Sequence, residues 1–214
     1  MSVQSRQAFA AQMAPRVVRV RRRIPPAVSA RPVFEPSAYG WLLAPGRVLT
    51  VERLVTGWPS EDEDVIEVQV ADGPWRAAAP GMVKVEQGLV ILDVAKPESK
   101  PGSSKATSVD TTTLTTLEPG ARRWAVVLDG SGGAPALVPV GIVAQAPKPY
   151  QFYRWSPGVM LPSGTPVVDR DGQLATLVSA PLWGLHDKPG EALYPTSAMK
   201  AMLEGAALWL PSTP

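Results

Sequence analysis

The sequence contains no cysteine and only one histidine, His186. Without cysteine the chain can form no disulfide, no thiolate metal site and no cysteine nucleophile. No group of His, Asp and Glu residues has the spacing of metal ligands either. We therefore expect no bound metal and no cofactor.

Long apolar runs are also missing. No run approaches the roughly 20 residues that a membrane span needs, and residues 1–13 lack the apolar core of a secretory signal. The expected location is the cytoplasm, or the periplasm if a signal peptide was removed. The formal net charge of +2 is too small to imply a nucleic-acid partner by itself.

Proline and glycine are abundant, with 24 and 18 residues among 214. This composition favours many short strands and turns over long helices. Short helices are expected only at residues 4–13, ended by Pro15, and at residues 195–204. Alternating or continuous apolar patterns predict strands at residues 16–23, 39–44, 47–52, 65–70, 75–79, 82–85, 89–94, 122–128, 137–146 and 173–180.

Residues 95–110 are rich in Lys, Pro, Ser and Gly and form the best linker candidate. They separate two halves with similar strand patterns. Residues 1–110 are expected to hold a short N-terminal helix, a first β-barrel and the linker. Residues 111–214 are expected to hold a second β-barrel and a C-terminal helix. The predicted fold class is all-β, with two antiparallel barrels.

The segment at residues 161–172 carries the main functional signal. Asp171-Gly172 between apolar runs predicts a hairpin turn. Before it, Ser163, Gly164 and Pro166 fit the nucleophile loop G-N-S-G-G-P-L-V of trypsin-like serine proteases. Five further segments, in the same order along the chain, also resemble the protease domain of the HtrA family of these enzymes. They are residues 39–50, 65–73, 119–126, 140–143 and 194–197.

The resemblance also assigns the other two positions of a catalytic triad. Residues 49–55 match the family motif L-T-N-x-H-V-V, which puts Arg53 where the histidine belongs. Residues 88–94 match D-L-A-L-L-K-V, which puts Gly88 where the aspartate belongs. An arginine stays protonated and cannot act as a base. We therefore expect no catalytic residue, and treat Arg53, Gly88 and Ser163 as vestigial triad positions.

The oxyanion hole of the family is altered as well. Leu161 stands where the family has glycine, and Pro162, directly before the serine, has no N–H. A leucine restricts the backbone at a position where glycine would turn freely.

These features predict a pseudoprotease, which acts as a scaffold or as a peptide-binding subunit of a larger assembly. The cleft of such a fold can bind an extended peptide by strand addition without a triad. The expected edge is residues 176–180. The residues expected to line the peptide groove are Leu161, Ser163, Val178, Ser179 and Ala180. Two tryptophans, Trp155 and Trp183, could be interface anchors or part of the core.

Two alternatives remain open. The first is an active serine hydrolase that uses Ser163 with a non-standard base, for which His186, Lys84 and Lys148 are conceivable although their spacing supports none of them. The second is a binder of nucleic acid or an anionic surface through the arginines of residues 16–23. The competing interpretation of that run is a solvated strand face, whose charges protect an exposed edge.

Overall fold

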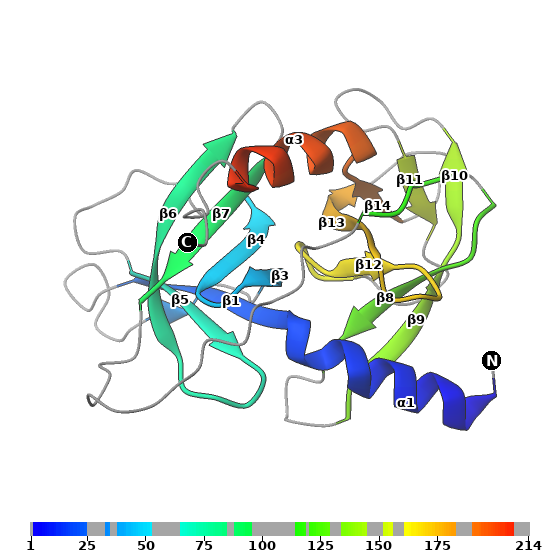
Figure 1. Ribbon diagram of the computed structural model, residues 1–214, viewed down its shortest axis with the longest axis horizontal. Helices are drawn as coiled ribbons and strands as arrows, with labels where there is room; N and C mark the ends of the chain where they lie inside the picture. The colour runs from blue at the N-terminus through cyan, green and yellow to red at the C-terminus, as the bar shows by residue number, and fades with distance from the viewer. Residues whose placement is uncertain are drawn as a thin grey trace, which may run out of the picture.

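The computed structural model describes two seven-stranded antiparallel sheets and two α-helices (Figure 1). Its described residues are 2–24, 33–34, 38–52, 65–84, 88–95, 114–118, 120–128, 134–144, 152–155, 161–182 and 190–207.

The first sheet closes on itself. It has the order β2-β1-β3-β4-β7-β6-β5, and β1 also pairs with β5, so six of the strands form a closed barrel. Its strands are β1 (Val17–Ile24), β2 (Val33–Phe34), β3 (Ala38–Ala44), β4 (Arg47–Val51), β5 (Val65–Val70), β6 (Arg76–Lys84) and β7 (Leu89–Val94).

The second sheet has the order β10-β11-β14-β13-β12-β8-β9. Its two outermost strands, β9 and β10, are separated in the chain by Gly141 alone. The two ends of this sheet are therefore joined by one bent segment. Its strands are β8 (Arg123–Val127), β9 (Ala136–Val140), β10 (Ile142–Ala144), β11 (Phe152–Trp155), β12 (Pro166–Val168), β13 (Leu174–Leu182) and β14 (Gly190–Leu193).

The two helices join the two sheets. Helix α1 (Val3–Met13) contacts β9 of the second sheet and leads through the 3-10 turn η1 (Ala14–Arg16) into β1 of the first. Helix α3 (Thr196–Ala207) follows the second sheet and contacts both β7 and β13. Figure 1 shows α1 beside the second sheet and α3 across the opposite side of the molecule. Neither described helix is long and apolar enough to cross a membrane.

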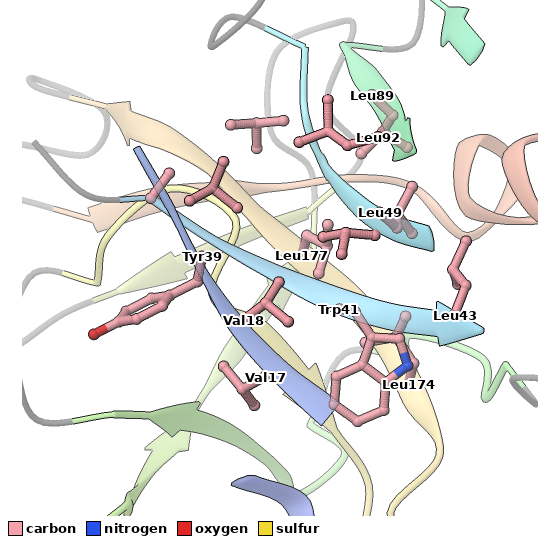
Figure 2. Close-up of a cluster of buried hydrophobic side chains, with 14 of the residues drawn as sticks. Val17, Val18, Tyr39, Trp41, Leu43, Leu49, Leu89, Leu92, Leu174 and Leu177 are labelled. Atoms are coloured by element: carbon pink, nitrogen blue, oxygen red, sulfur yellow. The ribbon is translucent and has the colours of Figure 1, made fainter. Parts of the chain in front are cut away.

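One apolar cluster runs from the first barrel into the second sheet, and a second, smaller cluster lies within the second sheet. Figure 2 shows Val18, Trp41 and Leu49 of the first sheet packed with Leu174 and Leu177 of β13. Fully buried methionines from α3, Met199 and Met202, belong to the same cluster. Helix α3 therefore packs on both sheets, because it contacts β13 and also contributes to the core of the first barrel.

The predicted class, mainly β with a helix near each end of the chain, is confirmed. Two details differ from the expectation. Residues 75–79 and 82–85 form one strand, β6, because a register shift between Pro80 and Met82 absorbs the predicted turn as an irregularity. Residues 137–146 are divided at Gly141 into β9 and β10. Most of the predicted linker, residues 96–110, and the region of Arg53 lie outside the described residues.

Candidate functional site

The turn that carries Ser163 is hydrogen-bonded to both sheets. Its own geometry is set by the Pro162 carbonyl, which accepts from the N–H of Thr165 at 3.2 Å and from the Thr165 hydroxyl at 2.6 Å. The Gly164 N–H donates to the Val178 carbonyl of β13 at 2.7 Å. The Ser163 carbonyl accepts from the N–H of Tyr39, on β3 of the first sheet, at 2.8 Å. The turn therefore lies at the junction of the two sheets.

Gly164 is required by this packing. Its φ of +78° lies in the left-handed region, which residues other than glycine rarely adopt. A Cβ at this position would also overlap the Tyr39 carbonyl oxygen. The backbone of β3 thus approaches too closely for any other residue.

Ser163 itself is only 4% exposed. Its Oγ has no hydrogen-bond partner among the residues that the structure describes. Buried hydroxyls are usually paired, because an unpaired one loses its bonds to water without replacement. Within that part of the chain, no side chain accepts the proton of the Ser163 hydroxyl. Arg53, His186 and Lys148 lie outside it, as does the side chain of Lys84.

Gly88, at the predicted aspartate position, precedes β7 with a φ of +68°. Its carbonyl accepts two hydrogen bonds, from the N–H of Glu52 at 2.9 Å and from the Tyr194 hydroxyl at 2.7 Å. A Cβ built on Gly88 would lie 3.0 Å from Cε1 of the Tyr194 ring. The buried tyrosine therefore occupies the space into which a side chain at residue 88 would project.

Glu52 lies beside this arrangement and was not singled out by the sequence analysis. Burial raises the pKa of its carboxyl above the ordinary value. Glu52 lies in the turn directly after β4, where its N–H donates to the Gly88 carbonyl. No local pattern in the sequence singled it out.

The predicted groove residues are close together but mostly buried. Leu161, Val178 and Ser179 are at most 3% exposed, and the bond between Gly164 and Val178 holds the serine turn against β13. Ala180 lies in β13, although its side chain is outside the described set, as are the side chain of Trp155 and all of Trp183.

The pairing of β13 narrows the predicted docking edge. Thr176 is paired with Val167 of β12, and the Val178 N–H and carbonyl are bonded to Thr165 and Gly164. These positions are therefore occupied by the chain itself. Beyond them, residues 179–182 pair only with β14 among the described residues.

Three arginines of the β1 run already have side-chain partners on the neighbouring strand β5. Arg21 binds Glu67 through Nη2 at 2.7 Å and lies over the Trp75 ring at 3.9 Å, and Arg23 is 3.7 Å from the same carboxylate. Arg19 bonds to the Gln69 side chain at 3.2 Å. Arginines already paired within a sheet have less charge to offer a phosphate backbone, which favours the interpretation as a strand face. The described residues also include no group of three or more acidic or histidine side chains that could hold a metal ion.

Comparisons with known proteins identify the fold. No family model and no curated protein matches the sequence. Among solved structures, the Rv3671c protease from M. tuberculosis in its active form matches with a TM-score of 0.62 at 18% identity, over 94% of this chain and 84% of that one. An inactive form of the same protease, in which a serine is replaced by alanine, matches with a TM-score of 0.62 at 16% identity, over 100% and 97%.

A third structure, the apo form of the MamO protease domain from Magnetospirillum magneticum, matches with a TM-score of 0.59 at 21% identity, over 89% of this chain and 96% of that one. At such identities the likeness concerns the fold. Two antiparallel sheets joined at a serine-bearing turn, with these neighbours, give the chain the fold of a trypsin-like protease domain.

Proposed function

We propose that this chain is a pseudoprotease, a trypsin-fold protein without protease chemistry that serves as a protein-interaction or scaffold subunit of a larger assembly. The observation that carries the proposal is the pair formed by Gly88 and Tyr194. At the position where the resemblance expects an aspartate, the chain has a left-handed glycine with a buried tyrosine ring against it.

Peptide cleavage by Ser163 would require the removal of its hydroxyl proton. A serine hydroxyl attacks a peptide carbonyl only when a neighbouring group removes its proton, and a third group normally orients that base. The resemblance puts Arg53 at the base position, and Gly88, at the aspartate position, has no carboxylate to orient a base. Neither arrangement supports a Ser–His–Asp relay.

The junction of the two sheets does not depend on a catalytic base. The serine turn is held by main-chain hydrogen bonds to Tyr39 and Val178, which need neither a base nor a charged side chain. A chain that keeps this junction while lacking the base retains a shaped surface that a protein partner can recognise.

A tagged fluorophosphonate probe tests the absence of chemistry, since such probes react with serines that a base has activated. We expect no labelling of the wild-type chain between about pH 7 and pH 9, and the same background with Ser163→Ala. Trypsin in the same tube verifies that the probe is active. Labelling that disappears in Ser163→Ala would contradict the proposal and favour an active hydrolase with a non-standard base.

The assembly is tested separately by gel filtration of a native cell extract followed by immunodetection of the chain. We expect elution well ahead of the purified chain. Co-elution with the purified chain would argue against a stable larger complex.

A further inference from the structure

Strand β13 has one side that no other described strand covers at its C-terminal end. Strand β12 pairs with it only as far as Leu177, and Val178 is then bonded to the serine turn. From residue 179 to residue 182 the described pairing is with β14 alone. An uncovered strand edge next to a turn is a place where an extended peptide can add as a further strand.

The register of β13 and β14 shows which groups face that edge. Pro181 is opposite Glu191, and Leu182 is opposite Gly190. In an antiparallel pair, opposite residues either exchange two hydrogen bonds or exchange none. Pro181 has no N–H, so it cannot form an exchanging pair with Glu191.

The orientation of Pro181 follows. Hydrogen-bonded and non-hydrogen-bonded pairs alternate, so the neighbouring pair, Leu182 with Gly190, is the hydrogen-bonded one. The carbonyl of Pro181 therefore points away from β14, toward the side on which no described strand lies. In a regular strand, the carbonyls of Val178 and Pro181 would face opposite sides. The register shift between these two residues allows both to face the same side, because a bulge changes which groups face each side. At this position the edge offers a hydrogen-bond acceptor and no donor.

We propose that Pro181 determines which peptides can add to the edge of β13 opposite β14 at residues 179–182, where no other described strand pairs. A docking peptide donates one N–H to the Pro181 carbonyl, but the peptide carbonyl opposite Pro181 finds no N–H donor there. An uninterrupted strand therefore loses one hydrogen bond there, and the edge selects a short extended segment of a partner protein that bends away at this residue and leaves that carbonyl in water. Edge prolines limit indiscriminate strand addition in the same way. This inference rests on the proposed function as a protein-interaction subunit.

The test uses random heptapeptides with blocked termini, selected separately on the wild-type chain and on Pro181→Ala and measured by fluorescence anisotropy. Restoring the N–H restores one main-chain hydrogen bond, so we expect peptides selected on Pro181→Ala to bind that variant about fivefold more tightly than they bind the wild-type chain. The matched control is Pro139→Ala on β9, a strand proline that pairs with Trp124 in the same sheet but lies at its far edge. It should leave the affinity unchanged.

A second measurement leaves the protein intact. Each amide of a peptide selected on the wild-type chain is N-methylated in turn, and methylation of the amide that reaches the Pro181 carbonyl should weaken binding at least about fivefold, because it removes that N–H. Circular dichroism verifies that each protein variant is folded.

The outcomes separate the two proposals. Equal affinity of wild-type and Pro181→Ala chains for a selected peptide overturns the role of Pro181 and leaves peptide binding intact. Tight binding by Pro181→Ala alone supports the role of Pro181 and removes peptide capture as a function of the natural chain. Failure of both proteins to select any peptide overturns both.

Discussion

Gly88 is fixed by its backbone conformation and by its neighbour at the same time. Its φ of +68° disfavours any side chain, and Tyr194 stands 3.0 Å from where a Cβ would be. Gly120 has a similar φ of +75°, but a Cβ added there would meet nothing within 4 Å. The two glycines therefore separate the cost of backbone strain from the cost of overlap with the ring.

We expect Gly120→Ala to lower the free energy of unfolding by about 1–2 kcal/mol, as left-handed strain alone would. Gly88→Ala should lower it by a further ~1 kcal/mol or more, because the Tyr194 ring must move. Urea denaturation of both variants measures the difference. Equal losses of unfolding free energy would show that the Tyr194 ring moves aside without a cost.

The partly buried carboxyl of Glu52 makes the stability of the chain depend on pH. Burial raises its folded-state pKa, so between the unfolded and folded values the folded chain binds more protons, and stability falls as the pH rises through that window. We expect Glu52→Gln to raise the melting temperature at pH 7 and to have little effect below about pH 4, where the carboxyl is protonated in both states. Calorimetry at the two pH values measures this, with the exposed Glu118→Gln as the control. A stabilisation equal at both pH values would contradict the burial argument.

At the scale of single elements, α1 is anchored by one face. Phe9 and Met13 are buried, and Met13 lies against Gly172 in the turn between β12 and β13, where a Cβ would be 2.9 Å from its sulfur. Ser2 caps the helix by accepting from the Ser5 N–H. The helix thus supports the hairpin that follows the serine turn.

Phe9→Ala should therefore destabilise the chain by about 3 kcal/mol, as expected when a buried aromatic side chain is lost. Val3→Ala is the control, since Val3 is 67% exposed and should change stability by less than about 0.5 kcal/mol. Thermal unfolding and the rate of proteolysis near residue 13 measure both. A small effect of Phe9→Ala would mean that α1 is dispensable.

Local patterns explain which elements the sequence could predict. The hairpin of β3 and β4 has apolar runs around Pro45-Gly46, and β12 and β13 flank Asp171-Gly172, so turn chemistry and alternation agree there. Strand β14 contains Gly190 and Ala192, which have low strand propensity, and forms through its pairing with β11 and β13. No local pattern predicts such a strand.

The candidate site shows the same division. The serine turn was found from its own residues, and Gly88 from a motif match. Its contact with Tyr194 was not predicted, because the two residues are 106 positions apart and no local rule connects them. The occupied positions of β13 were missed for a similar reason, since the serine turn folds back onto that strand.

At the scale of the whole molecule, the two halves of the chain depend on each other. The helix that follows the second sheet supplies Met199 and Met202 to the shared core, and β13 supplies Leu174 and Leu177. The Tyr39 hydroxyl of β3 also donates to the Leu128 carbonyl at 2.6 Å. A barrel deprived of these groups would expose a large apolar surface.

We therefore expect residues 1–110, expressed alone, to remain unfolded, with a poorly dispersed amide NMR spectrum. Adding residues 111–214 should restore dispersion, because it restores the missing core. A well-dispersed spectrum from the first fragment alone would show that its barrel is self-sufficient.

The contact between Gly164 and the Tyr39 carbonyl has a consequence for how such proteins are recognised from their genes. Packing alone forbids any larger residue after Ser163, so selection would preserve this glycine in lineages that cut peptides and in lineages that never do. A serine–glycine signature in this fold thus records how two sheets meet, and a genome survey that counts it as proof of proteolysis would overestimate the number of enzymes.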